Sequence, residues 1–313
     1  MGKGLLPADS PRALGCTGLQ AGDYAMAGFA DADVVVSIGY DLVEQSPQKW
    51  NPARDKTIIC VDTSPAEVDA YYTPAVELVG DIYHVLTRLG EECRGMTGGG
   101  GSPKLREATL GLLERSRLDD RVPMQPPRVL AEIRDALGRD DVLISDVGLH
   151  KLWIGRMFPA YEPNTTLIAN GLAGMGFAVP AGIAAKLVRP QAKVVTVSGD
   201  GGSLMNCQEL ETARRLGTAF VNVVWENRQY GSIVWKQDRR FGRHFGTDFT
   251  NPDFVVLAES FGLPAWRIAS ADELSVRLKH ALALDVSSLL VVPIDYSLDV
   301  AIAEGLGEEE VET

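Results

Sequence analysis

The sequence predicts an α/β protein built on a parallel sheet flanked by helices, with a smaller α/β segment before it. Short apolar, β-branched runs are bounded by turn residues, and helical patterns lie between them. Strands that alternate with helices of about 10–15 residues are typical of a parallel sheet covered on both faces. A glycine-rich stretch divides the chain, which indicates more than one domain.

The bulk composition is that of an ordinary globular chain. It has 313 residues, of which 45% are hydrophobic, and this length is sufficient for two packed domains. The formal net charge of -12 leaves no basic face for nucleic acid and gives no reason to expect adhesion to an anionic membrane. We see no signal peptide and no apolar run of about 18 residues that could span a membrane. The 4 cysteines lie far apart, so we expect reduced thiols and a cytoplasmic protein.

The clearest boundary is a Gly/Ser-rich linker predicted over residues 94–105. Such a run holds neither a helix nor a strand. It separates residues 1–93 from residues 106–300. The Glu-rich tail, residues 301–313, is expected to be disordered and solvated.

Residues 1–93 contain two β-rich runs, 33–38 and 57–61, with helical patterns between and after them. Short runs of this kind suit buried parallel strands. Two strands are too few for an independent doubly wound sheet. We therefore expect this segment to be the back half of a domain.

The larger segment alternates more fully. Strands are predicted over residues 142–145, 166–169, 194–198, 220–225 and 289–293. Helical patterns fall near residues 128–137, 175–187, 204–215, 253–262 and 271–284. Ligands of such sheets bind beyond the carboxyl ends of the strands, so the residues that follow the strands are the first candidates for a site.

Two of these strands end in an oxygen ligand. Gly199-Asp200-Gly201 follows one, and its glycines let a ligand approach the backbone closely. Asn227 ends the next, so a β-α-β connection brings Asp200 and Asn227 to the same sheet edge. One carboxylate and one amide oxygen suit Mg²⁺ completed by diphosphate oxygens and water. A lone Gly-Asp-Gly is usually only a turn. The prediction therefore rests on the joint pattern of a strand, Gly-Asp-Gly, a helix, a second strand and Asn227.

This joint pattern resembles the signature of thiamine-diphosphate enzymes. Other segments carry the same resemblance. Residues 146–153 and 170–181 resemble the cofactor-binding part of these enzymes, and residues 39–44 and 61–68 resemble the central domain of acetolactate synthases. Residues 292–297 are most similar to the catabolic branch of those synthases. The resemblance extends from about Lys3 to Ser297. It implies a thiamine-diphosphate-binding fold, with the diphosphate-binding domain preceded by part of a Rossmann-like central domain.

The resemblance also implies roles for individual residues. Asp200 and Asn227 would hold Mg²⁺ by their side chains, and Gln229 by its backbone carbonyl. Met175 would lie beneath the cofactor and force its bent conformation, although a core-filling methionine is the alternative. The cofactor-binding residues would be His150, Asn170, Gly171, Met175, Gly199, Gly201, Gly202 and Gly231. The neighbours of the substrate would be Ile233, Trp235 and Gln237, with plain packing as the alternative for Trp235.

The implied function is that of an acetolactate synthase-like carboligase, which condenses two pyruvates to 2-acetolactate with loss of CO₂. No catalytic residue is assignable, because the family's activating glutamate belongs to an N-terminal domain expected before this sequence. We therefore expect a truncated enzyme, or one completed by a partner chain or in a homo-oligomer, acting on a small 2-oxo acid. Another thiamine-diphosphate decarboxylase or carboligase and a non-catalytic cofactor-binding or assembly subunit remain alternatives, and FAD binding stays open.

Overall fold

The computed structural model describes residues 2–17, 28–43, 45–96, 106–107, 110–111, 114–115 and 117–297. Contacts divide the described residues into two compact units, the smaller within residues 16–107 and the larger within residues 2–15 and 110–297. Most of the predicted linker, residues 97–105, and the whole predicted tail lie outside the described residues. Within the described part of the chain, no helix combines the length and apolar character needed to cross a membrane.

The smaller unit contains a three-stranded parallel sheet in the order β1-β2-β3. Its strands are β1 (Val34–Ile38), β2 (Thr57–Asp62) and β3 (Val76–Val79), and its helices are α2 (Pro47–Trp50) and α3 (Ile82–Glu92). The first two strands confirm the sequence prediction. β3 is missed by it, because Glu77 interrupts its short apolar run.

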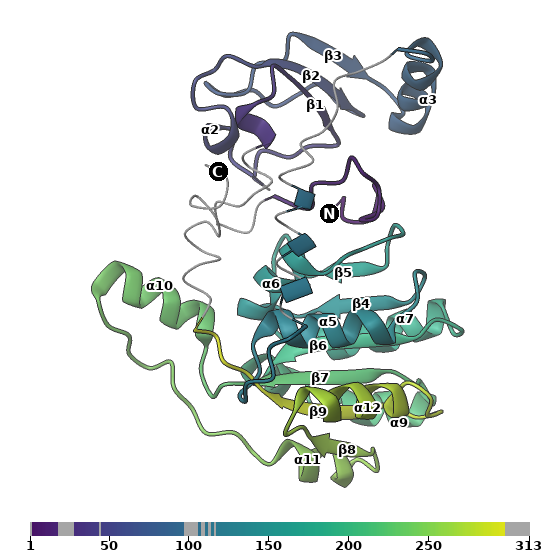
Figure 1. Cartoon of the computed structure of the whole chain (residues 1–313), viewed down its shortest axis with the longest axis vertical. Coiled ribbons are helices and arrows are strands. Elements are labelled where there is room, and N and C mark those ends of the chain that lie inside the picture. The colour runs from purple at the N-terminus through teal and green to yellow at the C-terminus, as the bar shows by residue number, and fades with distance from the viewer. Residues whose placement is uncertain are drawn as a thin grey trace. The chain divides into compact units, whose positions relative to one another are not determined.

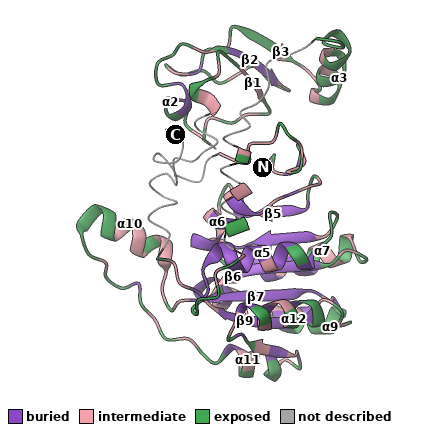
Figure 2. Ribbon diagram, viewed as in Figure 1, coloured by how far each residue is buried: buried purple, intermediate pink, exposed green. Residues whose placement is uncertain are grey.

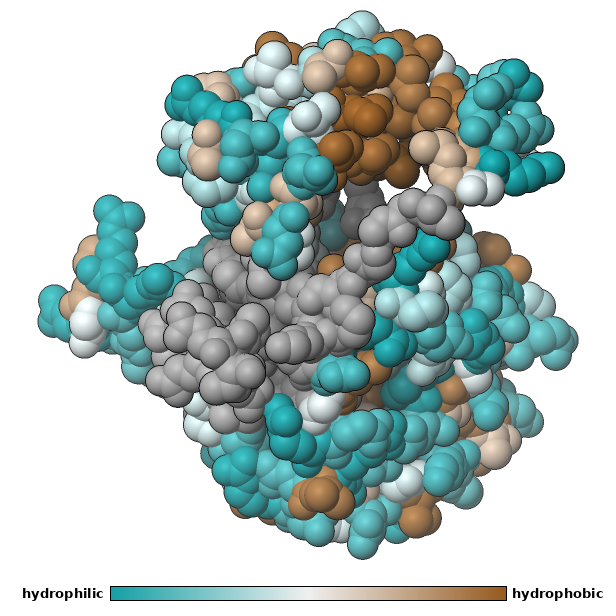
Figure 3. All heavy atoms as spheres, turned by 45° about the horizontal axis from the view of Figure 1, so that its top comes forward, coloured by the Kyte–Doolittle hydropathy of each residue, from teal (hydrophilic) through white to brown (hydrophobic). Residues whose placement is uncertain are grey.

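One side of this small sheet keeps apolar side chains in contact with solvent. Val34, Val36 and Ile38 on β1 are 47–49% exposed, and Figure 3 shows apolar atoms gathered on this unit. Parallel sheets are usually covered on both faces. The buried cluster of the unit is small, with Trp50, Ile58 and Tyr72 at its centre.

The larger unit is built on a six-stranded parallel sheet in the order β5-β4-β6-β7-β9-β8 (Figure 1). The strands are β4 (Val142–Ser145), β5 (Thr166–Ile168), β6 (Val194–Gly199), β7 (Val221–Glu226), β8 (Ala265–Arg267) and β9 (Ser288–Pro293). All five predicted strands form, and only the three-residue edge strand β8 is missed. The chain continues from β4 to β5 on one side and to β6 on the other. This reversal between β4 and β6 is the position at which open α/β sheets bind ligands.

Helices cover both faces of this sheet. They are α5 (Pro126–Ala136), α6 (Leu149–Met157), α7 (Ala178–Val188), α8 (Asp200–Met205), α9 (Glu209–Leu216), α10 (Gly231–Phe241), α11 (Phe254–Ser260) and α12 (Ala271–Ala281). Helices α7, α9 and α11 share one apolar core with the strands, while α5 packs against α6 and α12. The central strands β4, β6, β7 and β9 are almost entirely buried (Figure 2).

The single helix predicted over residues 204–215 is wrong, because two helices, α8 and α9, occupy this region. Asn206 lies between them and donates from Nδ2 to the Gly176 carbonyl at 2.9 Å. Gln208 donates from Nε2 to Asn206 Oδ1 at 3.2 Å. Side chains that form such local and tertiary hydrogen bonds compete with continued helix. Asp200 is the first residue of α8 rather than part of a turn after β6.

The first residues of the chain pack with the larger unit. Lys3 donates from Nζ to the Gly155 carbonyl at 2.9 Å, and the Ala8 N–H donates to the Ala160 carbonyl at 2.9 Å. The sequence does not predict this grouping, because it assigns residues 1–93 to one domain. The predicted domain bounds as a whole stay a prediction.

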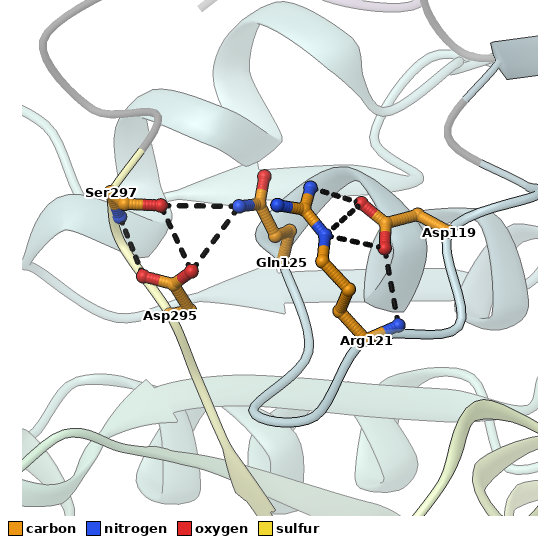
Figure 4. Close-up of polar contacts among 5 residues, drawn as sticks. All are labelled: Asp119, Arg121, Gln125, Asp295 and Ser297. Atoms are coloured by element: carbon orange, nitrogen blue, oxygen red, sulfur yellow. Dashed lines mark hydrogen bonds and ion pairs between the residues drawn. The ribbon is translucent and has the colours of Figure 1, made fainter.

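The end of β9 is fixed to the segment before α5 (Figure 4). Gln125, which is 2% exposed, donates from Nε2 to Asp295 Oδ2 at 3.3 Å and to Ser297 Oγ at 3.2 Å. The Asp295 N–H also donates to the Met124 carbonyl at 2.9 Å. These contacts hold the chain after β9 against the segment that leads into α5.

Candidate cofactor and metal site

Three neighbouring strands of the larger unit end together at the carboxyl edge of the sheet. Ser145 at the end of β4 pairs with Val197 of β6, and Gly199 at the end of β6 pairs with Trp225 of β7. The residues that follow these strands therefore lie close to one another. The site that they form borders the reversal of strand order between β4 and β6, where a ligand is expected.

Asp200 is the centre of this site. Its side chain is 1% exposed, and Oδ1 accepts the Gly201 N–H at 2.9 Å. Oδ2 accepts the N–H of Asn227 at 3.0 Å and that of Arg228 at 2.5 Å. The predicted proximity of Asp200 and Asn227 at one sheet edge is confirmed. Their roles as metal ligands stay a prediction.

The turn after β7 is shaped so that its backbone faces Asp200. Arg228 has φ of 59°, a left-handed conformation that is uncommon for residues other than glycine. In this conformation two successive N–H groups point at one carboxylate oxygen. The next residue, Gln229, pairs with Asp248 in a short bridge, and its Nε2 donates to Asp248 Oδ1 at 2.6 Å. All three residues predicted for the metal thus lie at the ends of β6 and β7.

The described residues contain no group of three or more His, Cys, Asp or Glu side chains that could hold a metal ion. An ion beside Asp200 would therefore depend on amide and backbone oxygens and on the oxygens of a ligand. Mg²⁺ is commonly bound in this way, by one or two carboxylates together with phosphate oxygens and water.

Three of the predicted glycines are required by close packing. A Cβ on Gly201 would lie 2.6 Å from Tyr230 Cε1, and one on Gly202 would lie 2.9 Å from Asp146 Oδ2. A Cβ on Gly231 would lie 2.5 Å from Leu149 Cδ1. Any side chain at these positions would displace its neighbours, so the strand ends approach each other only because glycine is present.

His150 lies in the first turn of α6 and is 1% exposed. A Cβ on Gly148 would lie 2.6 Å from its Cε1, so the ring rests directly on the backbone. Burial lowers the pKa of His150 from 6.5 to about 4, and the nearby charge of Lys151 acts in the same direction. The ring is therefore neutral at neutral pH.

The His150 ring has an unused polar atom. Nε2 is buried and has no hydrogen-bond partner among the described residues, and the same holds for Nε1 of Trp225. The two rings meet edge to face, with their centroids 6.1 Å apart. Buried polar groups almost always have a partner, so a water molecule or a polar ligand group is expected beside these two atoms.

Asp146 is a site residue that the sequence analysis misses. It is 1% exposed, and it accepts the N–H of Gly176 at 3.0 Å and that of Phe177 at 3.2 Å. Burial raises the pKa of Asp146, and these hydrogen bonds oppose the increase. The signal that could have revealed it is an acidic residue directly after a strand that is buried throughout, residues 142–145.

The segment that Asp146 holds carries three of the predicted cofactor residues, Asn170, Gly171 and Met175. Gly171 has a left-handed φ of 72°. Met175 is 36% exposed and therefore does not fill the core of this chain. Leu172 in the same segment is fully exposed. The segment presents apolar side chains beside the site from a backbone that is fixed at its end.

The three predicted substrate neighbours all lie on α10, which has no buried residue. Ile233 and Gln237 are four residues apart and share one face of the helix, whereas Trp235 points to another face. Gln237 accepts the Phe245 N–H on Oε1 at 2.8 Å, and the Arg239 guanidinium lies 5.7 Å from the centre of the Trp235 ring. Their role toward a substrate stays a prediction.

The sequence analysis also misses Asn251, Glu226 and Arg267. Asn251 contacts Asp200, and Glu226 forms an ion pair with Arg267 at 2.5 Å. Burial alone would raise the pKa of Glu226, but hydrogen bonds from Arg267 and Asn251 and the positive charge of Arg267 lower it below its ordinary value. Neither Asn251 nor Arg267 stands in a local sequence pattern that marks a site.

Comparison with known proteins agrees with this geometry. Residues 146–292 match the C-terminal TPP binding domain of thiamine pyrophosphate enzymes, and residues 1–89 match the central domain of the same enzymes. The chain therefore belongs to the family of thiamine pyrophosphate enzymes. Thiamine pyrophosphate is another name for thiamine diphosphate.

Individual relatives of the chain narrow the comparison to acetolactate synthases. The chain is 36% identical to an acetolactate synthase of Bacillus subtilis, over 87% of this chain and 48% of the relative. It is 34% identical to a catabolic acetolactate synthase of Raoultella terrigena, over 88% and 50%. A probable acetolactate synthase large subunit of Methanocaldococcus jannaschii is 32% identical, over 94% and 52%. The chain is thus a homologue of acetolactate synthases over most of its length, and it spans about half the length of these relatives.

Proposed function

We propose that the residues after β4, β6 and β7 bind the diphosphate end of thiamine diphosphate together with Mg²⁺. Asp200 and Asn227 would hold the ion by their side chains, and Gln229 by its backbone carbonyl. This donor set fits Mg²⁺, because it is made of oxygens and leaves positions for diphosphate oxygens and water. The single observation that carries the proposal is the buried carboxylate of Asp200, held by backbone N–H groups of the turn after β7.

The surroundings of this carboxylate also suit a diphosphate. The His150 ring donates a hydrogen bond to the Asp146 backbone carbonyl, so Nε2 of the neutral ring is an acceptor. A water molecule bound to the diphosphate would provide the partner that this buried atom lacks. The glycines at positions 199, 201, 202 and 231 let a ligand approach the backbone. Asn170, Gly171 and Met175 would contact the rest of the cofactor from the segment before α7.

Bound thiamine diphosphate supplies the electron sink that allows a 2-oxo acid to lose CO₂ and form a new carbon–carbon bond. The residues of this chain would bind and orient the cofactor. Met175 would support the cofactor rings from its exposed position, and Ile233, Trp235 and Gln237 on α10 would lie beside the substrate. Apolar residues around the reacting atoms would exclude water.

We propose that the protein takes part in an acetolactate synthase-like reaction, in which two pyruvates give 2-acetolactate and CO₂. The support is its identity to acetolactate synthases across both matched domains. Since the chain spans about half of these relatives, we further propose that the complete active site includes groups from another domain or from a partner chain. We also propose that the protein forms an oligomer and is located in the cytoplasm.

A binding experiment tests the site. Titration of the purified chain with thiamine diphosphate, followed by tryptophan fluorescence, should show binding with MgCl₂ and none with EDTA. Asp200→Ala should remove the Mg²⁺-dependent binding. Asp272→Ala, which removes an exposed carboxylate in α12, should bind as the wild type does. Equal affinity in Asp200→Ala and wild type would refute the metal assignment.

An activity experiment tests the reaction. The chain is incubated with pyruvate, thiamine diphosphate and Mg²⁺, alone and with the N-terminal domain of a related synthase. Acetolactate in either mixture, absent with Asp200→Ala, would support the proposal. Acetaldehyde without acetolactate would indicate a decarboxylase instead. Tight Mg²⁺-dependent binding without any product would indicate a non-catalytic subunit.

A further inference from the structure

Asn251 lies between two buried carboxylates at the candidate site. Its Nδ2 donates to Asp200 Oδ2 at 2.9 Å and to Glu226 Oε1 at 3.2 Å. Asp200 and Glu226 are 1% and 8% exposed. Asn251 precedes α11 by three residues, in a segment that comes 51 residues after Asp200 in the sequence.

The side-chain amide separates two like charges. Buried carboxylates that face each other directly repel, and one of them then tends to be protonated. The Asn251 NH₂ group lies between the two carboxylates and supplies one hydrogen to each. One oxygen of Asp200 and one of Glu226 therefore accept a hydrogen bond from the same side chain.

The Glu226 carboxylate is itself fixed from the edge of the sheet. Arg267, the last residue of β8, donates from Nη1 to Oε2 at 2.5 Å and from Nη2 to Oε1 at 3.3 Å. A guanidinium that bonds both oxygens fixes the plane of the carboxylate. The contacts thus run from Arg267 through Glu226 and Asn251 to Asp200.

We propose that Asn251 is a positioning residue for the metal-binding carboxylate, with the Glu226–Arg267 ion pair as its anchor. Together with the N–H groups of Asn227 and Arg228, it holds Oδ2 of Asp200 and so keeps the carboxylate in one orientation before an ion arrives. Groups that orient a metal ligand typically change metal affinity by about 10- to 100-fold when they are removed. The inference rests on the proposed Mg²⁺ site.

The test measures the Mg²⁺ requirement rather than turnover. The full chain with a saturating concentration of thiamine diphosphate is titrated with MgCl₂, and the half-saturating concentration is read from tryptophan fluorescence. Asn251→Ala should raise this concentration by about tenfold or more. Asn251→Ser, which keeps a shorter donor, should give an intermediate value and replaces Asn251→Ala if that variant does not fold.

A matched control separates positioning from a loosened loop. Asp253 caps α11 through the Val255 N–H at 2.9 Å and bonds neither Asp200 nor Glu226. Asp253→Ala should lower the melting temperature but leave the Mg²⁺ requirement unchanged. Equal shifts of the Mg²⁺ requirement in Asn251→Ala and Asp253→Ala would overturn the inference.

A double-variant cycle tests the anchor. Arg267→Gln should raise the Mg²⁺ requirement in the wild type but not in Asn251→Ala, because the arginine is expected to act only through Asn251. If Arg267→Gln raised the Mg²⁺ requirement equally in the wild type and in Asn251→Ala, the Glu226–Arg267 ion pair would not be the anchor of Asn251. A wild-type Mg²⁺ requirement in Asn251→Ala, with binding lost in Asp200→Ala, would overturn the inference and leave the metal site intact. Wild-type binding that does not respond to Mg²⁺ would overturn both.

Discussion

Both oxygens of the Asp146 carboxylate accept the N–H of Gly176, each at 3.0 Å. This contact joins the end of β4 to the segment before α7, thirty residues later in the sequence. The same carboxylate packs against α8, where a Cβ on Gly202 would lie 2.9 Å from Oδ2. A single buried side chain therefore bonds the segment before α7 and also contacts the start of α8.

Asp146→Asn should destabilise the larger unit. The new NH₂ group would face the N–H groups of Gly176 and Phe177 and leave a donor unsatisfied, which costs about 1–3 kcal/mol in the free energy of unfolding. Urea unfolding followed by tryptophan fluorescence measures it. Asp140→Asn, at an exposed position, should change stability by less than about 0.5 kcal/mol. Equal stability of the two variants would contradict the prediction.

The neutral His150 should make stability depend on pH. Its pKa is about 4 in the folded chain and 6.5 in the unfolded chain. Between these values the unfolded state binds more protons, so the free energy of unfolding falls as the pH decreases, by at most about 1.4 kcal/mol per pH unit. His150→Phe should remove this part of the slope in unfolding measured between about pH 7 and about pH 5. His84→Gln, at an exposed position, should keep the wild-type slope.

A methyl group on Gly202 should disturb the site. Its Cβ would lie 2.9 Å from Asp146 Oδ2, so α8 or the carboxylate must move. We expect Gly202→Ala to lose about 1–3 kcal/mol of stability and to bind thiamine diphosphate more weakly. Gly174→Ala is the control, because a Cβ there meets no atom within 4 Å. Calorimetric melting and cofactor titration of both variants decide the matter; an unaffected Gly202→Ala would show that this contact can relax.

Gln125→Glu should destabilise the end of β9. The variant replaces the donor to Asp295 and Ser297 with a buried carboxylate beside that of the half-buried Asp295. Repulsion raises the pKa of the new group, so the folded state takes up a proton more readily than the unfolded state. The loss of stability should therefore be larger at neutral pH than in mild acid. Gln125→Leu, which introduces no charge, should show no such pH dependence relative to wild type.

The sequence predicts the centre of the site because that part depends on strand ends. Two parallel strands joined by a helical connection both end at the carboxyl edge of the sheet. This places Asp200 beside Asn227 independently of the other elements of the fold. Asn251 could not be found in this way, since it reaches Asp200 from a loop with no periodic pattern. Long-range contacts of this kind leave no local signal.

The misassigned elements have similar causes. β3 and β8 are short and each contains a charged residue, so neither forms an apolar run, and β8 is defined by its pairing with β9. The helix predicted over residues 204–215 is interrupted because Asn206 bonds the backbone of Gly176, a partner that only the tertiary structure supplies. Propensity within the segment favours continuation, and the tertiary contact overrides it.

Helix α10 contributes no residue to the core, whereas Asp200, Gly202 and Glu226 at the candidate site are buried. Replacing a side chain on α10 therefore costs little stability, while replacing one around Asp200 costs much. Selection, or an engineer, can therefore vary the α10 surface at Ile233, Trp235 and Gln237 at small cost in stability, whereas the buried residues at the ends of β6 and β7 cannot change in this way. The fold thus separates buried positions near Asp200, where most substitutions destabilise the protein, from exposed positions on α10, where substitutions can accumulate.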